Sequence, residues 1–152
     1  MRRWMIHVLA ACFLMGCAAK APLPDDIRIT SPQEKLPAHV VNYIGVWERI
    51  EGGVEGGTKE PQALTIVIEE IKPPNVKAIY SWGDRKGDKN GGWLRVDGTI
   101  TGETIVLKWR TKLGRDRTLT IVPGDTSEFI RASYEKTPGK VSRRSILKKK
   151  ST

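Results

Sequence analysis

The chain has 152 residues and a formal net charge of +9, with 26 lysines and arginines against 17 aspartates and glutamates. This length accommodates one domain with a flanking tether, and two cysteines cannot form the disulfide framework of a small secreted fold. The positive excess favours anionic neighbours such as phospholipid headgroups or acidic polymers.

The first seventeen residues have the layout of an export signal. Arg2 and Arg3 precede a mostly apolar run, Trp4–Met15, and Gly16 leads to Cys17. A basic start, a short apolar run and a small residue at the cleavage point are typical of a secretory signal. The segment resembles a bacterial lipobox. This resemblance implies cleavage before Cys17 and a diacylglyceryl group on its thiol.

A transmembrane helix and an ordinary cleaved signal are the alternatives. The apolar run is shorter than the roughly 20 residues that a span needs, and an ordinary signal needs no cysteine at this point. Ala18 follows the cysteine, which in lipoproteins of this kind points to the outer membrane. We therefore expect residues 1–16 to be a lipoprotein signal peptide. The mature protein would face the periplasm on its lipid anchor, where it meets no nucleic acid.

Removal of the first 16 of 152 residues leaves 136, and the loss of Arg2 and Arg3 lowers the formal charge from +9 to +7. Residues 17–42 hold the lipidated cysteine and a proline-rich polar stretch with Pro22, Pro24 and Pro37. The pattern predicts a flexible tether. As a loose coil it would span about 25–30 Å and let the folded part lift away from the membrane.

From Tyr43 onward, short runs of β-branched and aromatic residues alternate with glycine-rich turns, which predicts a β domain over residues 43–148. Several runs alternate apolar and polar residues, so one face of each strand is expected to be buried and the other exposed to solvent. The predicted strands are Val46–Ile50, Leu64–Ile71, Val76–Trp82, Trp93–Ile100, Thr104–Arg110, Thr118–Val122, Phe129–Glu135 and Val141–Leu147.

Eight such strands without crossover helices predict an all-β, antiparallel up-and-down meander. Closure into a small barrel removes both exposed edges and is our first expectation, with a two-sheet sandwich as the alternative. A membrane-spanning barrel is excluded because cations such as Lys77, Arg95 and Lys108 fall on the outward faces, where lipid would lie.

The segment Asn42–Glu48, which contains Gly45-Val46-Trp47, resembles the opening of the lipocalin and wider calycin families. The resemblance implies a lipocalin-like barrel in which Gly45 lets the chain bend into the first strand and Trp47 plugs one end. In that group a basic side chain of the last strand lies over the tryptophan ring. Arg143 or Arg144 is the residue expected to do so here.

An eight-stranded barrel either fills its interior with side chains or holds one small ligand. Trp47, Tyr80, Trp82 and Trp109 are the candidate ligand-binding residues, because aromatic walls are typical of apolar pockets. The alternative is that these rings form ordinary core. Trp93 is out of phase with Leu94 and is expected outside or at a rim.

The sequence offers little for catalysis or metal binding. The fragment Asp88-Lys89-Asn90-Gly91 has part of a calcium-loop pattern, but cations crowd it and no glutamate occupies the twelfth position. His39 is the one histidine left after cleavage, and it lies in the tether. We expect no enzymatic activity, no cofactor and no metal.

Two functions from different classes remain. The first is a membrane-anchored, lipocalin-like module that binds a small apolar or amphipathic ligand. The second is a structural or interaction lipoprotein with a packed core that contacts anionic envelope polymers or partner proteins. The second rests on the positive charge and on a basic tail over residues 149–152, where Lys148–Lys150 is expected beyond the last strand.

Overall fold

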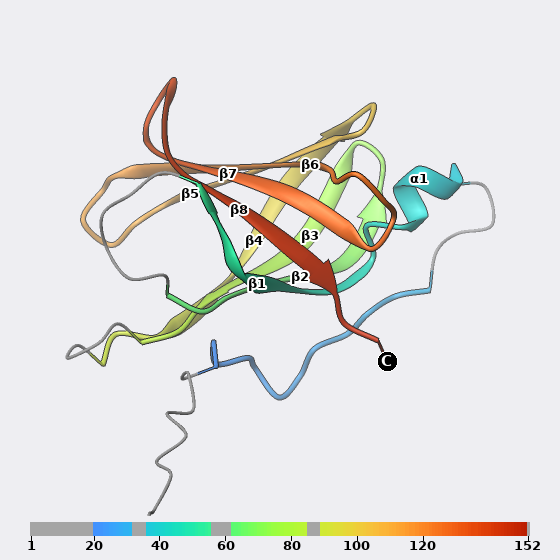
Figure 1. Cartoon of the computed structure of the whole chain (residues 1–152). Coiled ribbons are helices and arrows are strands. Elements are labelled where there is room, and N and C mark those ends of the chain that lie inside the picture. The colour runs from blue at the N-terminus through green and yellow to red at the C-terminus, as the bar shows by residue number, and fades with distance from the viewer. Residues whose placement is uncertain (1–19, 32–35, 56–61, 85–88, 152) are drawn as a thin grey trace, which may run out of the picture.

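The computed structural model describes residues 20–31, 36–55, 62–84 and 89–151, with the backbone alone at 51–55. The predicted signal peptide and Cys17 lie outside these residues. One short helix and eight strands follow one another along the chain (Figure 1). Their bounds are α1 Ala38–Val41, β1 Gly45–Glu55, β2 Leu64–Lys72, β3 Asn75–Trp82, β4 Gly92–Thr101, β5 Thr104–Arg110, β6 Asp116–Pro123, β7 Phe129–Thr137 and β8 Lys140–Lys149.

Every strand pairs antiparallel with the next in the chain, and β8 pairs with β1, so the meander closes into a barrel. The predicted all-β barrel is confirmed, and the sandwich alternative is not the observed fold. Each predicted strand lies within an observed one. The largest difference is in β1, which continues through Gly52-Gly53 with a register shift between Arg49 and Val54. A bulge accommodates glycine inside a strand, so these residues do not end it.

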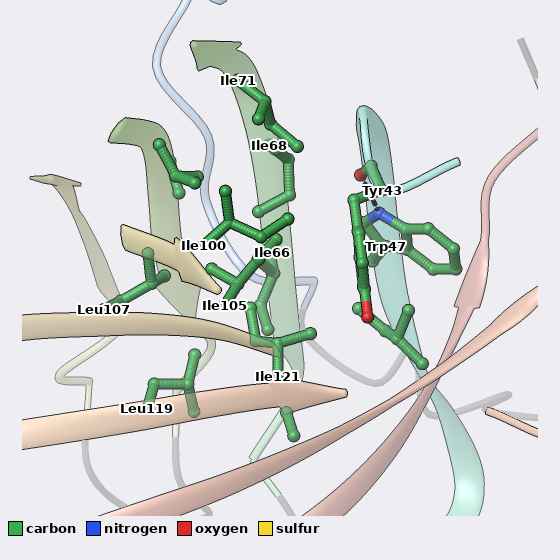
Figure 2. Packing of buried hydrophobic residues seen from close by; sticks show 14 of the residues in the cluster. Tyr43, Trp47, Ile66, Ile68, Ile71, Ile100, Ile105, Leu107, Leu119 and Ile121 are labelled. Carbon is green, nitrogen blue, oxygen red and sulfur yellow. Dashed lines mark hydrogen bonds between the residues drawn. The ribbon is translucent and has the colours of Figure 1, made fainter. Parts of the chain in front are cut away.

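Branched aliphatic side chains on the inward faces of the strands fill the half of the barrel that lies next to α1. Ile66 and Ile68 of β2 meet Ile105 of β5 and Ile121 of β6, and all four are fully buried (Figure 2). These residues belong to the alternating runs of the sequence, because every second side chain of a strand points to the same face. This core closes one end of the barrel.

The helix α1 and the residues after it cover that closed end. Val40, Tyr43 and Ile44 are buried in the same cluster as Trp47. The Tyr43 hydroxyl donates to the carbonyl of Glu103, 2.5 Å away in the β4–β5 turn. The end with the α1 helix and the chain's C-terminal residues is thus sealed, and the β3–β4, β5–β6 and β7–β8 connections lie at the other, open end (Figure 1).

Residues 20–31, here called the strap, lie along the outside of the barrel wall. The Thr30 N–H donates to the Glu69 carbonyl over 2.8 Å, and the Ser81 hydroxyl donates to the Pro22 carbonyl. Val67 of β2 and Ile79 of β3 point outward, yet both are fully buried. The strap covers this sector, with Ala21 and Pro24 themselves buried.

The loose coil expected over residues 17–42 is therefore wrong for residues 20–31. The physical reason is that β2 is apolar on both faces near its middle, so its outer face needs a cover. A second expectation is also wrong. Lys148 and Lys149 belong to β8, and the Lys150 N–H donates to the Val46 carbonyl over 2.9 Å. These lysines continue the barrel wall and do not form a separate tail.

Candidate ligand cavity at the open end

A cavity of about 800 Å³ opens at the end of the barrel opposite α1. Leu119 and Ala132 form part of its floor, above the aliphatic core, and turn residues such as Thr111 and Lys112 line its mouth. A volume of this size lies within the roughly 300–1,000 Å³ typical of small-molecule sites. The barrel is therefore packed in its closed half and hollow in its open half.

Four aromatic rings from three strands form one wall of the cavity. Tyr80 is central: its ring centroid lies 5.0 Å from Trp109, 5.7 Å from Trp82 and 6.2 Å from Tyr134. The Tyr80 and Tyr134 rings are stacked, with an interplanar angle of 9°. Such offset contacts stabilise an aromatic cluster beyond the burial of its area. The four rings therefore present a continuous aromatic surface to the cavity.

Two neighbouring guanidinium groups lie on inward faces of the barrel wall, and one of them lines the cavity. Arg143 lines the cavity, and Arg49 shares the inward face of β1 with Trp47. Burial is the main cause that lowers the pKa of Arg49, and the positive charge of Arg143 lowers it further. Among the described residues, no ion pair joins either guanidinium to a carboxylate. The site therefore combines an aromatic wall with concentrated positive charge.

Trp47 lies at the other end of the barrel, 1 % exposed. Its indole N–H donates to the Tyr43 carbonyl over 2.7 Å (Figure 2). Burial raises the pKa of Tyr43 to about 12. Of the four predicted ligand-binding residues, Tyr80, Trp82 and Trp109 come together in the cavity. Trp47 is packed in the closed end and does not line it.

The cation over the Trp47 ring is Lys149, with its Nζ 5.3 Å from the ring centroid, and not Arg143 or Arg144. The strand register explains why a lysine takes this place, because Lys149 of β8 is directly opposite Trp47 of β1. Arg143 lies in the cavity, and Arg144 is exposed opposite Ser133. The Lys149 ammonium also donates to the Asn42 carbonyl over 2.7 Å, and burial lowers its pKa.

Gly45 has a φ of +130°, a conformation that favours glycine, as β1 begins. At the open end, Trp93 is 42 % exposed, and the Arg95 guanidinium lies 5.8 Å from its ring centroid. This is the rim position expected from its phase against Leu94.

Sequence reasoning missed three residues of these ends: Arg49, Tyr134 and Lys149. Arg49 and Tyr134 could have been found by extending the alternation, since they share faces with Trp47 and with Ala132. Lys149 required the β1–β8 register, which no local signal gives.

The described residues hold no group of three or more His, Cys, Asp or Glu side chains that could bind a metal ion. Asp84 accepts the Gly91 N–H over 2.7 Å across the β3–β4 connection, while Asp88 of the calcium-like fragment lies outside the described residues. Among the described residues, no helix has the length and the hydropathy that a membrane-spanning helix requires.

Comparison with known proteins gives no matching family model and no matching curated protein. Among solved structures, the chain is similar to a crystal structure of a mutant of the fluorescent protein UnaG, with a TM-score of 0.48 and 12 % sequence identity. The match covers 74 % of this chain and 99 % of that one.

Proposed function

We propose that the protein is a membrane-anchored binding module that holds a small amphipathic molecule in the open-end cavity. The ligand has an apolar body and an anionic head. The observation that carries this proposal is a cavity lined by an aromatic wall and by Arg143, with Arg49 beside Arg143. Neither guanidinium group has an acidic partner among the described residues. The proposed role is binding, without catalysis and without a cofactor.

The aromatic wall favours the apolar body of the ligand. Tyr80, Trp109 and Leu119 present ring faces and aliphatic carbon to the cavity. Removing apolar surface from water stabilises a complex by about 25 cal/mol per Å² before the costs of association. The open cavity supports this function over the alternative of an interaction lipoprotein with a packed core.

The charge of Arg49 and Arg143 favours an anionic head. Two like charges in partly buried positions destabilise each other. Burial is the main cause that lowers the pKa of Arg49, and the charge of Arg143 is the second. A carboxylate or phosphate between them would offset that repulsion and accept charge-assisted hydrogen bonds. A neutral ligand of the same shape would leave the repulsion in place.

Anchoring through a lipidated Cys17 is the second part of the proposal. In the sequence, only Ala18, Ala19 and Lys20 separate Cys17 from the buried Ala21 of the strap. Three extended residues reach about 10 Å, so the barrel would remain close to the bilayer. Mass spectrometry of the mature amino terminus tests this part, and an unprocessed, unacylated Cys17 would contradict it.

Tryptophan fluorescence tests ligand binding directly, because Trp82 and Trp109 lie in the cavity wall. We expect fatty acids, lysophospholipids or isoprenoid phosphates to change the emission, and the matched fatty alcohols or isoprenoid alcohols to bind more weakly. The Arg143→Met variant should reduce the preference for the acid by about tenfold or more, since a hydrogen bond to a charged group contributes about 1.5–3 kcal/mol.

The matched control is Lys108→Met, which removes a cation from the outward, exposed face of β5 next to Trp109. This variant should leave the acid preference unchanged. No emission change across the whole panel would exclude the ligand-binding function. Equal binding of acids and alcohols by the unaltered protein would exclude the anionic head alone.

A further inference from the structure

We infer that the rim of the open end is a docking surface for an anionic phospholipid bilayer. The rim consists of Trp93, the β5–β6 turn at residues 111–115 and the tip of the β7–β8 hairpin at residues 138–141. This inference goes beyond the proposed function, because it requires neither lipidation of Cys17 nor a ligand in the cavity.

The first observation is the distribution of exposed apolar side chains. Four large hydrophobic residues are exposed among those the structure describes, and three of them are in the rim: Leu113 at 78 %, Trp93 at 42 % and Val141 at 40 %. The fourth, Ile29, lies in the strap. Single exposed apolar residues are ordinary, but their collection on one edge indicates a contact surface.

The second observation is the charge that surrounds these side chains. Lys112 and Arg115 flank Leu113 in one turn, and Lys140 precedes Val141 in the other. The nearby carboxylates are engaged: Asp116 lies 3.4 Å from the Arg110 Nε, and Glu135 accepts the Gly139 N–H over 3.0 Å. Apolar tips among cations match a bilayer surface, whose anionic headgroups cover a hydrocarbon interior.

The closed end differs in both respects. Its β4–β5 and β6–β7 connections carry Glu103, Asp125 and Glu128, and no described residue there is a large exposed hydrophobic. The lysines nearby have other roles: Lys150 pairs with Glu48 at 3.2 Å, and Lys149 covers Trp47. The barrel is therefore asymmetric along its axis, and only one end fits an anionic surface.

The course of the strap is the third observation. The strap begins beside Ser81 at the open end and runs toward the closed end (Figure 1). The first described residues of the strap thus lie at the same end of the barrel as the rim. Docking through the rim would place the cavity mouth on the bilayer, so an amphipathic ligand could move between the two without crossing water.

Hydrogen exchange of the full chain in lipid vesicles tests the inference. Vesicles of phosphatidylethanolamine with phosphatidylglycerol are compared with neutral phosphatidylcholine vesicles. We expect the anionic vesicles to slow exchange at residues 111–115 and 139–141, and not at the closed-end residues 102–103 and 124–128. Salt at 1 M, where the Debye length is about 3 Å, should abolish the difference.

The Leu113→Asp/Val141→Asp variant should lose this protection, and the matched Ile29→Asp variant should keep it. Replacement of Lys112 by alanine should weaken docking about fivefold, the effect of one basic residue near an anionic leaflet. Lys108→Ala, on the outward wall, should not. Unchanged exchange at the closed-end amides shows that each variant is folded.

Protection at the closed end, equal protection by neutral vesicles, or protection that survives in the double aspartate variant would each overturn the inference. The fluorescence titration distinguishes this failure from failure of the proposed function. The double aspartate variant should bind the soluble ligand as the unaltered protein does, because neither Leu113 nor Val141 lines the cavity.

Discussion

A single lysine ties the last strand to the first at the closed end. Lys149 covers the Trp47 ring, donates to the Asn42 carbonyl and lies against Gly45, where an added Cβ would meet the lysine Cε at 3.2 Å. One side chain therefore fixes the indole, the end of α1 and the start of β1. Lys149 thus takes the place over the Trp47 ring in which an arginine was expected.

The Lys149→Ala variant should lose about 1–2 kcal/mol of unfolding free energy, because it removes a cation–π contact of about 0.5–2 kcal/mol together with a hydrogen bond. Urea unfolding followed by circular dichroism measures this change. The control is Lys140→Ala, which alters an exposed lysine at the start of the same strand. Equal stability of the two variants would show that the lysine over Trp47 contributes nothing.

At the scale of elements, the strands were predictable because their signal is local. Alternation such as that of Ile105 and Leu107 with their less buried neighbours indicates a half-buried strand directly from adjacent residues. The error at Gly52-Gly53 arose because glycine pairs mark both turns and bulges, and only the pairing partner decides between them. Strand number and order therefore followed from the sequence, while the ends of β1 and β8 did not.

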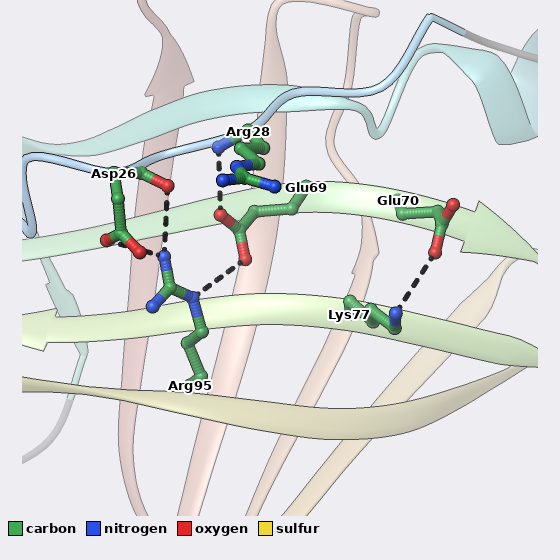
Figure 3. Close-up of polar contacts among 6 residues, drawn as sticks. All are labelled: Asp26, Arg28, Glu69, Glu70, Lys77 and Arg95. Carbon is green, nitrogen blue, oxygen red and sulfur yellow. Dashed lines mark hydrogen bonds and ion pairs between the residues drawn. The ribbon is translucent and has the colours of Figure 1, made fainter.

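The strap was not predictable, because long-range contacts fix its position. Arg95 of β4 donates to the Asp26 carboxylate over 2.8 Å and contacts Glu69 over 3.3 Å (Figure 3). Glu69 in turn accepts the Arg28 N–H over 3.1 Å. These partners are up to 69 positions apart in sequence, and no local pattern in a proline-rich segment reports them.

Acid should release the strap. The hydrogen bond from Arg95 lowers the pKa of Asp26 below its ordinary value of 3.8. A carboxyl with a lowered pKa in the folded state stabilises that state above its unfolded pKa, and this contribution is lost as the pH falls through the folded pKa. We therefore expect limited proteolysis within residues 20–31 to accelerate below about pH 4.

The Asp26→Asn variant provides the control for this experiment. It should show faster cleavage at neutral pH and a smaller change on acidification, because the ionisable group is gone. A strap equally protected at pH 7 and pH 3 would show that the Asp26–Arg95 contact does not hold it in place.

At the scale of the whole molecule, the cavity was predictable only in part. Tyr80, Trp82 and Trp109 could be identified as inward aromatics, but the sequence did not show that a cavity opens beside their rings. Trp47 shares their chemistry and their inward direction, yet it packs against Tyr43 in the closed half. The position of a ring along the barrel axis decides whether it lines the cavity or packs in the core. That position depends on the register between the strands.

The strap also sets the boundary of the domain, which begins before residue 43. A chain that starts at Leu36 should unfold more readily than one that starts at Lys20, because it uncovers Val67 and Ile79. Full burial of each such side chain contributes about 1.5–3 kcal/mol, so we expect a loss of at least about 2 kcal/mol. Thermal melts and binding of an apolar dye compare the two chains, and identical results would contradict the covering role.

The short pairing between β4 and β5, here called the β4–β5 seam, bears on the length of the ligand that the cavity can hold. Pairing between β4 and β5 covers only Gly98–Thr101 and Thr104–Leu107. Beyond Gly98, where an added Cβ would lie 2.6 Å from the Val106 carbonyl oxygen, the two strands diverge toward the open end. Leu94 and Arg95 point to opposite sides of β4, yet both line the hollow. The cavity therefore reaches the unpaired part of the β4–β5 seam. We expect the tail of a ligand that is too long for the cavity to lie along this part of the wall.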